Sequence, residues 1–445
     1  MKTSIKFINH ASVIISGKKT VVLTDPWYEG DAFNKGWNLI TETTDGEIDA
    51  TLNIVTHIWL SHEHPDHFSI SFFKKFKNKI KEKKIKILFQ KTKDKRVISF
   101  IKQYNLDFIE LDFNKKINLD NEFSVLCIKD GFYDSALLVY NKNEKILNLN
   151  DCDISTPNRA TEVFKVTGAV DVLLTQFSFA AWKGGKGNVK WRNDSAREKL
   201  ETINLQIKYF LPKIVIPFAS FIYFSNNDNF YLNDAINTPK NVSLYFKNIS
   251  SKVIFMKPQD KIGGDNEYYS NNKAVEYWEK LYSSLNSKKV NVYDTISEIE
   301  IKRSYEAYCN RILERNSLIL MKLIKFLIPI SFFRPVIIEV YDLNKNFKID
   351  YLSRKIELIN KKGMLKMNSA CLNFLFKNTF GFDTLTVNGC FEEVSKNGFL
   401  NATKTLAIEN LNNLGIYITI RNLLSFYVIK LFLTKLYRVA RKLGT

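Results

Sequence analysis

A histidine-rich string constrains this chain more than any other part of its sequence. Four of the five histidines lie between residues 57 and 67, and three of them fall in Ser61-His62-Glu63-His64-Pro65-Asp66-His67. The string follows the apolar run 57–60, which predicts a buried strand that ends in a turn. Side chains two residues apart in an extended segment point to the same side, so His62 and His64 can offer imidazole nitrogens to one cation. The sequence therefore predicts a metal site directly after a strand.

The second half of the string extends this site. Asp66 and His67 come where the chain bends into a predicted helix, Ser69–Phe76, so their side chains can reach the same place from a second direction and hold a second ion. Imidazole with carboxylate favours zinc, iron or manganese over calcium or magnesium. We expect one or two zinc ions first, with manganese or iron as alternatives. Solvated or capping histidines are the other interpretation, which this spacing beside a buried strand does not favour.

Composition excludes several classes of protein. The chain has 445 residues, long enough for two or three domains, and its 45% hydrophobic and 25% charged residues exclude a disordered chain. The cysteines form no Cys-x-x-Cys or Cys-x-His pair, so disulfide scaffolds, zinc ribbons and Rieske clusters are not expected. The N-terminus lacks the long apolar core of a signal peptide, which predicts a cytoplasmic protein.

The formal net charge of +19 would suit nucleic acid or anionic lipid, but the basic residues are spread along the chain, so nucleic-acid binding is not expected. The exception is Arg421–Thr445, where six basic residues and no acidic one alternate with apolar residues. This pattern predicts a basic amphipathic helix that either contacts a membrane surface or docks on its own domain. No apolar run is long enough to span a bilayer.

Strand and helix patterns alternate through the first part of the chain, which predicts stacked α/β layers. We place a metal-binding catalytic domain at 1–260, because the string Gly263-Gly264-Asp265-Asn266 resembles a linker. Residues 261–445 are predicted to form an accessory α+β domain. Within it, Asn378–Gly389 is interpreted as a turn followed by a strand that ends in an Asn-Gly turn.

The string His62-x-His64-x-Asp66-His67 resembles the signature of the metallo-β-lactamase fold hydrolases. Further strings resemble the branch that holds lactonase-like enzymes and the metallo-β-lactamase-like part of CMP-N-acetylneuraminate hydroxylase, namely His10-Ala11-Ser12, Leu23-Thr24-Asp25-Pro26-Trp27, Thr175-Gln176-Phe177-Ser178 and Pro217-Phe218-Ala219-Ser220. The resemblance covers residues 1–260. It implies an αββα sandwich of two mixed sheets, with the active site along one edge.

Family members complete the metal site with a histidine, a bridging aspartate and a last histidine, but this chain has no histidine after His67. The resemblance implies Asp151 as the bridging residue, with Asp153 as the alternative. The first missing histidine would fall near Asp134 or Asp130, whose carboxylates can replace it. The last would follow Phe218-Ala219-Ser220, where only weak oxygen ligands are offered by Ser225-Asn226-Asn227.

Function is predicted from this ligand set. A bound cation lowers the pKa of water and makes hydroxide available, and Asp66 can orient that water or accept its proton. The leading hypothesis is a hydrolase that uses metal-bound hydroxide on a small polar or anionic metabolite or sugar derivative. The alternatives are an iron-dependent oxygenase that modifies an activated sugar with electrons from another protein, a non-catalytic relic of the fold that binds ligands, and a nuclease that only the charge favours.

Other residues carry weaker hypotheses. His10 can reach the site as a substrate-contacting or supporting group, with a structural role as the alternative, whereas His57 is expected to be a core histidine. Trp27, Trp37 and Trp182 can line a sugar- or nucleotide-sized pocket or pack in the core. The basic loop 182–188 can close over an anionic substrate, although an ordinary surface loop is the first interpretation.

Overall fold

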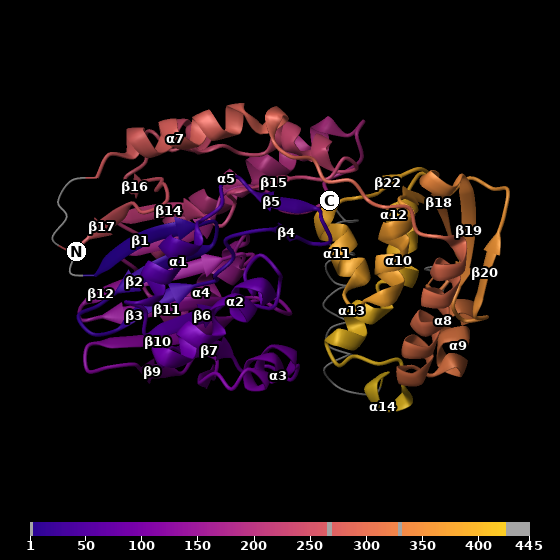
Figure 1. Ribbon diagram of the computed structural model, residues 1–445, viewed down its shortest axis with the longest axis horizontal. Coiled ribbons are helices and arrows are strands. Elements are labelled where there is room, and N and C mark those ends of the chain that lie inside the picture. The colour runs from indigo at the N-terminus through magenta and orange to yellow at the C-terminus, as the bar shows by residue number, and fades with distance from the viewer. Residues whose placement is uncertain (1–2, 265–268, 328–331, 424–445) are drawn as a thin grey trace. The chain divides into compact units, whose positions relative to one another are not determined.

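The computed structural model describes residues 3–264, 269–327 and 332–423 (Figure 1). The chain divides into two compact units, the first formed by residues 1–183 and 187–291 and the second by 184–186 and 292–445. The first unit therefore extends beyond the boundary expected at residue 260. The functional roles assigned to the two domains stay predictions.

The first unit contains two seven-stranded sheets that face each other. The first sheet has the order β17-β1-β2-β3-β6-β7-β8, and its strands are β1 Ser4–Asn9, β2 Ser12–Ser16, β3 Val21–Thr24, β6 His57–Leu60, β7 Lys86–Gln90, β8 Phe108–Leu111 and β17 Lys261–Gly263. The second has the order β16-β14-β13-β12-β11-β10-β9, with β9 Lys116–Asn118, β10 Phe123–Lys129, β11 Ser135–Asn141, β12 Glu144–Asn150, β13 Val172–Gln176, β14 Ile214–Phe218 and β16 Lys252–Val253. Both sheets mix parallel and antiparallel pairs.

Helices cover the outer faces of both sheets (Figure 1). On the first sheet these are α1 Asp45–Leu52, α2 Ile70–Glu82 and α3 Arg96–Gln103, and on the second they are α4 Pro157–Thr167 and α5 Val189–Phe210. Residues 58–60 of strand β6 are apolar because both faces of the strand are covered: Trp59 packs in the core between the sheets, whereas Ile58 and Leu60 pack under α1–α3. The predicted αββα sandwich is confirmed.

The remaining parts of the first unit close its edges. A small sheet has the order β15-β5-β4, with β4 Asp31–Ala32, β5 Trp37–Leu39 and β15 Ile222–Phe224. It is followed by η1 Phe230–Ala235, α6 Pro239–Tyr245, α7 Asn271–Ser283 and η2 Leu285–Ser287. Strand β17 pairs with β1, and Trp278 of α7 stacks on Phe221 with 3.9 Å between ring centroids. These contacts are the physical reason why residues beyond 260 belong to the first unit.

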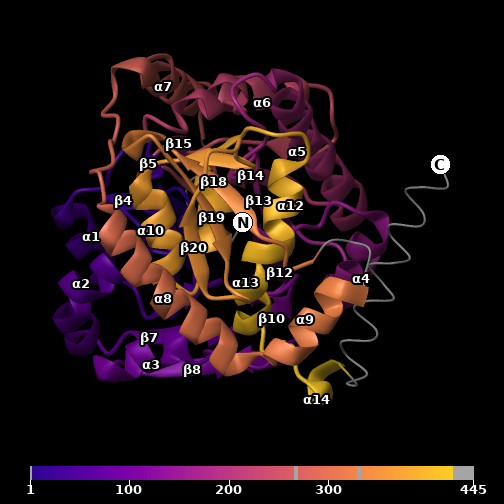
Figure 2. The same ribbon diagram turned by 90° about the vertical axis from the view of Figure 1, so that its right-hand side faces the viewer.

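The second unit is an α+β domain, as predicted from its mixed pattern. Its sheet has the order β20-β19-β18-β21-β22, with β18 Val336–Val340, β19 Lys345–Asp350, β20 Lys355–Leu358, β21 Leu365–Met367 and β22 Glu392–Glu393. Figure 2 shows helices gathered around this sheet. The helical segments are α8 Glu298–Arg315, α9 Leu318–Leu327, η3 Tyr341–Leu343, α10 Ser369–Lys377, α11 Gly381–Asn388, α12 Gly398–Leu406, α13 Ile408–Asn413 and α14 Ile420–Leu423.

The strand predicted within Asn378–Gly389 is wrong, because this segment forms helix α11. Its β-branched residues suggested a strand, but Phe382 and Leu385 are buried three residues apart on one helical face, and Gly389 ends the helix in the left-handed conformation with φ 68°. Most of the amphipathic segment predicted at 421–445 lies outside the described residues. Within the described part of the chain, no helix is long and apolar enough to cross a membrane.

Candidate metal centre

The histidine string lies between the end of β6 and the start of α2. Helix α2 begins after Ser69, whose Oγ accepts a hydrogen bond from the Phe72 N–H at 3.3 Å. The turn before it is held at Ser61, whose carbonyl oxygen accepts hydrogen bonds from Gln90 Nε2 at 2.8 Å and Ser135 Oγ at 2.7 Å. Strand ends on both sheets thereby fix the backbone from which the site histidines project.

One half of the site consists of His62, His64 and Asp134. The His62 Nε2 atom lies 2.9 Å from His64 Nδ1 and 3.7 Å from Asp134 Oδ1. Burial holds the pKa of His62 well below its usual range, so its imidazole is neutral and has a lone pair for a metal. Burial raises the pKa of Asp134 to about 7. Two imidazoles and a carboxyl group thus lie close together, and the expectation that they hold a metal ion stays a prediction.

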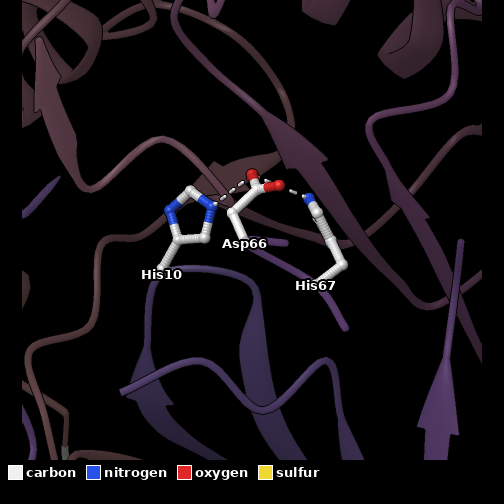
Figure 3. A group of neighbouring side chains, drawn as sticks. All are labelled: His10, Asp66 and His67. Carbon is white, nitrogen blue, oxygen red and sulfur yellow. Dashed lines mark hydrogen bonds and ion pairs between the residues drawn. The ribbon is translucent and has the colours of Figure 1, made fainter. Parts of the chain in front are cut away.

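The other half consists of His10, Asp66 and His67 (Figure 3). Asp66 Oδ2 lies 3.4 Å from His10 Nε2 and 3.2 Å from His67 Nε2. One ligand atom from each residue lies within 4.8 Å of the others. Although burial opposes it, the Asp66 and Asp151 carboxylates raise the pKa of His67 well above its usual range. Burial alone would raise the pKa of Asp66, but His67 and His10 hold it well below the usual range of an aspartate.

Asp151 lies between these two halves. Its Oδ2 atom is 3.3 Å from His67 Nε2, and His62, His67 and Asp151 can each place one ligand atom within 4.8 Å of the others. Gln176 Nε2 donates a hydrogen bond to Asp151 Oδ1 at 3.1 Å, and Lys199 Nζ donates to Gln176 Oε1 at 2.5 Å. The bridging role of Asp151 that the resemblance implies stays a prediction.

Two buried polar atoms of this site have no hydrogen-bond partner, and they indicate whether the residues fit a metal ion. Asp66 Oδ1 and His67 Nε2 are buried and have no hydrogen-bond partner. Buried polar atoms without partners are costly, and the close contacts of His67 Nε2 with two carboxylates lack hydrogen-bond geometry. Coordination to a cation would satisfy His67 Nε2, and a water held at that cation could donate a hydrogen bond to Asp66 Oδ1. The residues therefore fit one or two metal ions.

Asp25 supports the second half, and sequence reasoning assigned it no role. Its Oδ2 atom lies 3.2 Å from His67 Nδ1 and accepts a hydrogen bond from Asn150 Nδ2, while Oδ1 accepts one from the Ser61 N–H at 2.8 Å. A carboxylate on Nδ1 leaves Nε2 to face the ligands. The signals in the sequence were an aspartate directly after a strand and its place in the string Leu23-Thr24-Asp25-Pro26-Trp27.

His10 occupies the region where the last family histidine was expected. Its carbonyl oxygen accepts a hydrogen bond from the Ala219 N–H at 2.9 Å, which joins the β1–β2 turn to the segment after β14. His10 and Ala219 both have positive φ, 39° and 52°, a conformation that non-glycine residues rarely adopt and that is found at functional sites. The geometry thus groups His10 with the metal ligands, a role that we had not given it.

The substitute ligands expected after Ser220 do not reach the centre. Ser225 Oγ donates to Asn38 Oδ1 at 3.1 Å, Asn226 Nδ2 donates to the Lys35 carbonyl at 3.4 Å, and the Asn227 N–H donates to the Asn291 carbonyl at 2.9 Å. These residues hold loops together. The expectation that Ser225-Asn226-Asn227 offers ligands is wrong, because their polar atoms are used in these loop contacts.

Two aspartates named as alternatives have other partners. Asp130 accepts hydrogen bonds from Arg159 Nε at 2.8 Å and from the Asp153 N–H at 2.7 Å, so its carboxylate is part of a structural ion pair. Asp153 is exposed.

His57 lies at the opposite end of β6, with Nδ1 2.9 Å from Thr56 Oγ1, and burial lowers its pKa to about 4. It is a structural histidine, as expected.

The three tryptophans are buried rather than spread along an open pocket. The Trp27 ring lies edge-on to His10, with centroids 5.5 Å apart. Trp37 packs on Phe33, and Trp182 packs on Trp191. Their proposed contact with substrate stays a prediction.

Basic side chains lie near the open side of Asp151. Besides Lys199, the half-buried Lys183 comes directly before the loop that precedes α5. Burial and the charge of Lys199 lower the pKa of Lys183. Lys199 is connected through Gln176 to Asp151, so at least this positive charge lies beside the centre.

No family model matches this chain. Its sequence is similar to the cytidine monophosphate-N-acetylneuraminic acid hydroxylase of Danio rerio, with 25% identity over 247 residues that cover 52% of this chain and 40% of that protein. It is also 25% identical over 277 residues to the inactive cytidine monophosphate-N-acetylneuraminic acid hydroxylase of Homo sapiens, covering 58% and 53%. The chain thus spans about half or less of the length of these curated relatives.

Similar solved structures include a possible metal-dependent hydrolase from Veillonella parvula, with a TM-score of 0.46 and 16% identity over 59% of this chain and 99% of that one. They also include the metallo-β-lactamase fold protein YhfI from Bacillus subtilis, with a TM-score of 0.37 and 11% identity over 58% and 98%. The resemblance to metallo-β-lactamase fold proteins and to the hydroxylase, predicted from the sequence, is confirmed.

Proposed function

We propose that this chain is a metal-dependent hydrolase that acts on a small polar, anionic metabolite or sugar derivative. One observation carries the proposal: two groups, each of two imidazoles and one carboxyl, meet at one edge of the sandwich with Asp151 between them. In this assignment His62, His64 and Asp134 hold one ion, and His10, Asp66 and His67 hold the other. Zinc is the expected metal, because it accepts these ligands in open catalytic sites.

A divalent ion in such a site lowers the pKa of a water ligand towards about 7. The chain's own residues supply orientation. Asp66 turns Oδ2 towards His10 and His67, which leaves Oδ1 to accept a hydrogen bond from the attacking water. Lys183 and Lys199 beside Asp151 supply positive charge for an anionic group of the substrate.

The test is the metal content of protein purified without an affinity metal, measured by elemental mass spectrometry for the wild type and the double variant His62→Ala/His64→Ala. We expect one or two equivalents of zinc in the wild type and a loss in the variant. Hydrolysis of lactones, esters and phosphodiesters should fall with the metal. Wild-type protein that binds neither zinc, manganese nor iron when each is supplied would refute the proposal.

A second candidate is an iron-dependent oxygenase that modifies an activated sugar. Two observations favour it: the groups His10, Asp66, His67 and His62, His67, Asp151 each have the two histidines and one carboxylate typical of non-haem iron, and the curated relatives are named as hydroxylases. Electrons would come from another protein, because the sequence has no Rieske cysteine–histidine pattern. Bound iron, together with oxygen uptake that depends on a sugar nucleotide, would favour this candidate over the hydrolase.

A further inference from the structure

Helix α9 in the second unit exposes an apolar face. Ile319, Leu323 and Phe326 are 72%, 46% and 87% exposed, and their spacing of four and three residues places them on one side of the helix. Met321, which is fully buried, anchors the helix from its other side. Helices that face water usually place polar residues on the outer side, so an exposed apolar stripe indicates an interaction surface.

The last described helix lies beside this stripe. The Ser317 N–H donates to the Ile418 carbonyl at 2.8 Å, and the Ile418 N–H donates to Asn316 Oδ1 at 2.8 Å, so the segment before α14 is tied to the start of α9. Figures 1 and 2 both show α14 next to α9. Ile420 of α14 is 67% exposed. We call the group Ile319, Leu323, Phe326 and Ile420 the α9 surface.

The charges carried by the α9 segment itself are of one sign. From Arg315 to Ile338 the sequence has no acidic residue and four basic ones, Arg315, Lys322, Lys325 and Arg334. Lys325 pairs with Asp350 at 3.4 Å, whereas Lys322 is exposed. Residues 424–445 also carry basic and no acidic residues. Like charges repel, so this sequence is a poor electrostatic match for α9, whereas an anionic surface complements both segments.

We propose that the α9 surface binds an anionic lipid membrane. The apolar side chains enter the headgroup region, and Lys322 and its basic neighbours meet the negative headgroups, as in helices that lie in the membrane interface. Binding would hold the protein at a membrane surface without a spanning helix. The inference does not depend on the metal centre.

The test is sedimentation of the full chain with phosphatidylcholine vesicles that contain or lack phosphatidylserine. We expect binding only to the anionic vesicles, and weaker binding as the salt concentration rises. The double variant Ile319→Asp/Phe326→Asp should lower vesicle affinity about tenfold or more, because it removes apolar area and adds negative charge. Lys322→Glu should lower it by a smaller factor.

Ile299 offers a matched control. It is 81% exposed in the same unit, but lies on α8 between Glu298 and Glu300, so Ile299→Asp should leave vesicle binding unchanged. Circular dichroism should show the same fold for every variant, since all substituted side chains are exposed. The proposal is overturned by wild-type protein that ignores anionic vesicles, by an equal loss in Ile299→Asp, or by light scattering that shows the α9 surface buried in a dimer sensitive to the same substitutions.

Discussion

Replacing Asp25 with asparagine should weaken the binding of one metal ion and leave the other in place. Three groups meet this carboxylate: the Ser61 N–H on Oδ1, and Asn150 Nδ2 and His67 Nδ1 on Oδ2. An asparagine can still accept from Ser61, but its NH₂ would then face the Asn150 NH₂ and the His67 ring. His67 could accept that hydrogen bond only through Nδ1, which moves its proton to Nε2, the atom needed for the metal.

The expected loss follows from this change of tautomer. Removing a partner that orients a metal-bound histidine typically lowers affinity by about 10- to 100-fold, or about 1.4 to 2.7 kcal/mol. Zinc titration against a chromophoric chelator should therefore show one site weakened by this factor in Asp25→Asn. The site built on His62 and His64 should keep its affinity, because Asp25 does not contact either ring within the described contacts.

Asp130→Asn is the matched control. Asp130 is also a buried carboxylate beside the site, but it pairs with Arg159 rather than with an imidazole. The Asp130→Asn variant should bind zinc as the wild type does, even if its free energy of unfolding is lower. Equal zinc affinity in Asp25→Asn and the wild type, or an equal loss in the Asp130→Asn control, would refute the assignment of Asp25 as the residue that orients His67.

Three further predictions concern single groups. His10→Ala should lower zinc content from two equivalents to one, measured by elemental mass spectrometry. Zinc binding at pH 7 should release protons, seen by calorimetry in buffers of different ionisation enthalpy, because carboxylates raise the pKa of His67 and burial raises that of Asp134 to about 7. Burial lowers the pKa of His57 to about 4, so its folded form binds fewer protons than the unfolded chain; this stability is present above about pH 6.5 and lost towards pH 4. Between pH 7 and 5 the wild type should lose about 2 kcal/mol more unfolding free energy than His57→Gln in denaturant titrations.

The sequence predicted the first half of the site because its signal is local. His62 and His64 are two residues apart after a strand, so strand periodicity alone brings them together. Asp134 and Asp151 follow other strands, and they were found by resemblance to a family rather than by spacing. The layered fold was predictable for a similar reason, since each strand of the first unit carries its own apolar pattern.

The position of His10 beside Asp66 and His67 depends on long-range contacts, so the sequence could suggest only that His10 reaches the site. Its carbonyl meets Ala219 across more than two hundred residues of chain, and no local pattern specifies that approach. Asp25 was missed for the same reason, since its partners Ser61 and Asn150 belong to different sheets. The strand predicted at α11 was wrong for a different reason. Burial of Phe382 and Leu385 on one helical face outweighed the strand propensity of the β-branched residues.

Backbone conformation ties these long-range contacts to metal binding. His10, Asp25, Asn150 and Ala219 all have positive φ, and such strain costs on the order of 1–3 kcal/mol per residue when the side chain is not glycine. Local sequence would relax each of these turns, so the surrounding contacts must hold them. The His10–Ala219 and Asp25–Asn150 hydrogen bonds do so in pairs, each joining one sheet to the other. An ion bound by His10 and His67 would connect the same two pairs through its ligands, and its binding energy would offset their strain. We therefore expect His10 to take the place of the last histidine that the resemblance implies, since the β1–β2 turn meets the segment after β14.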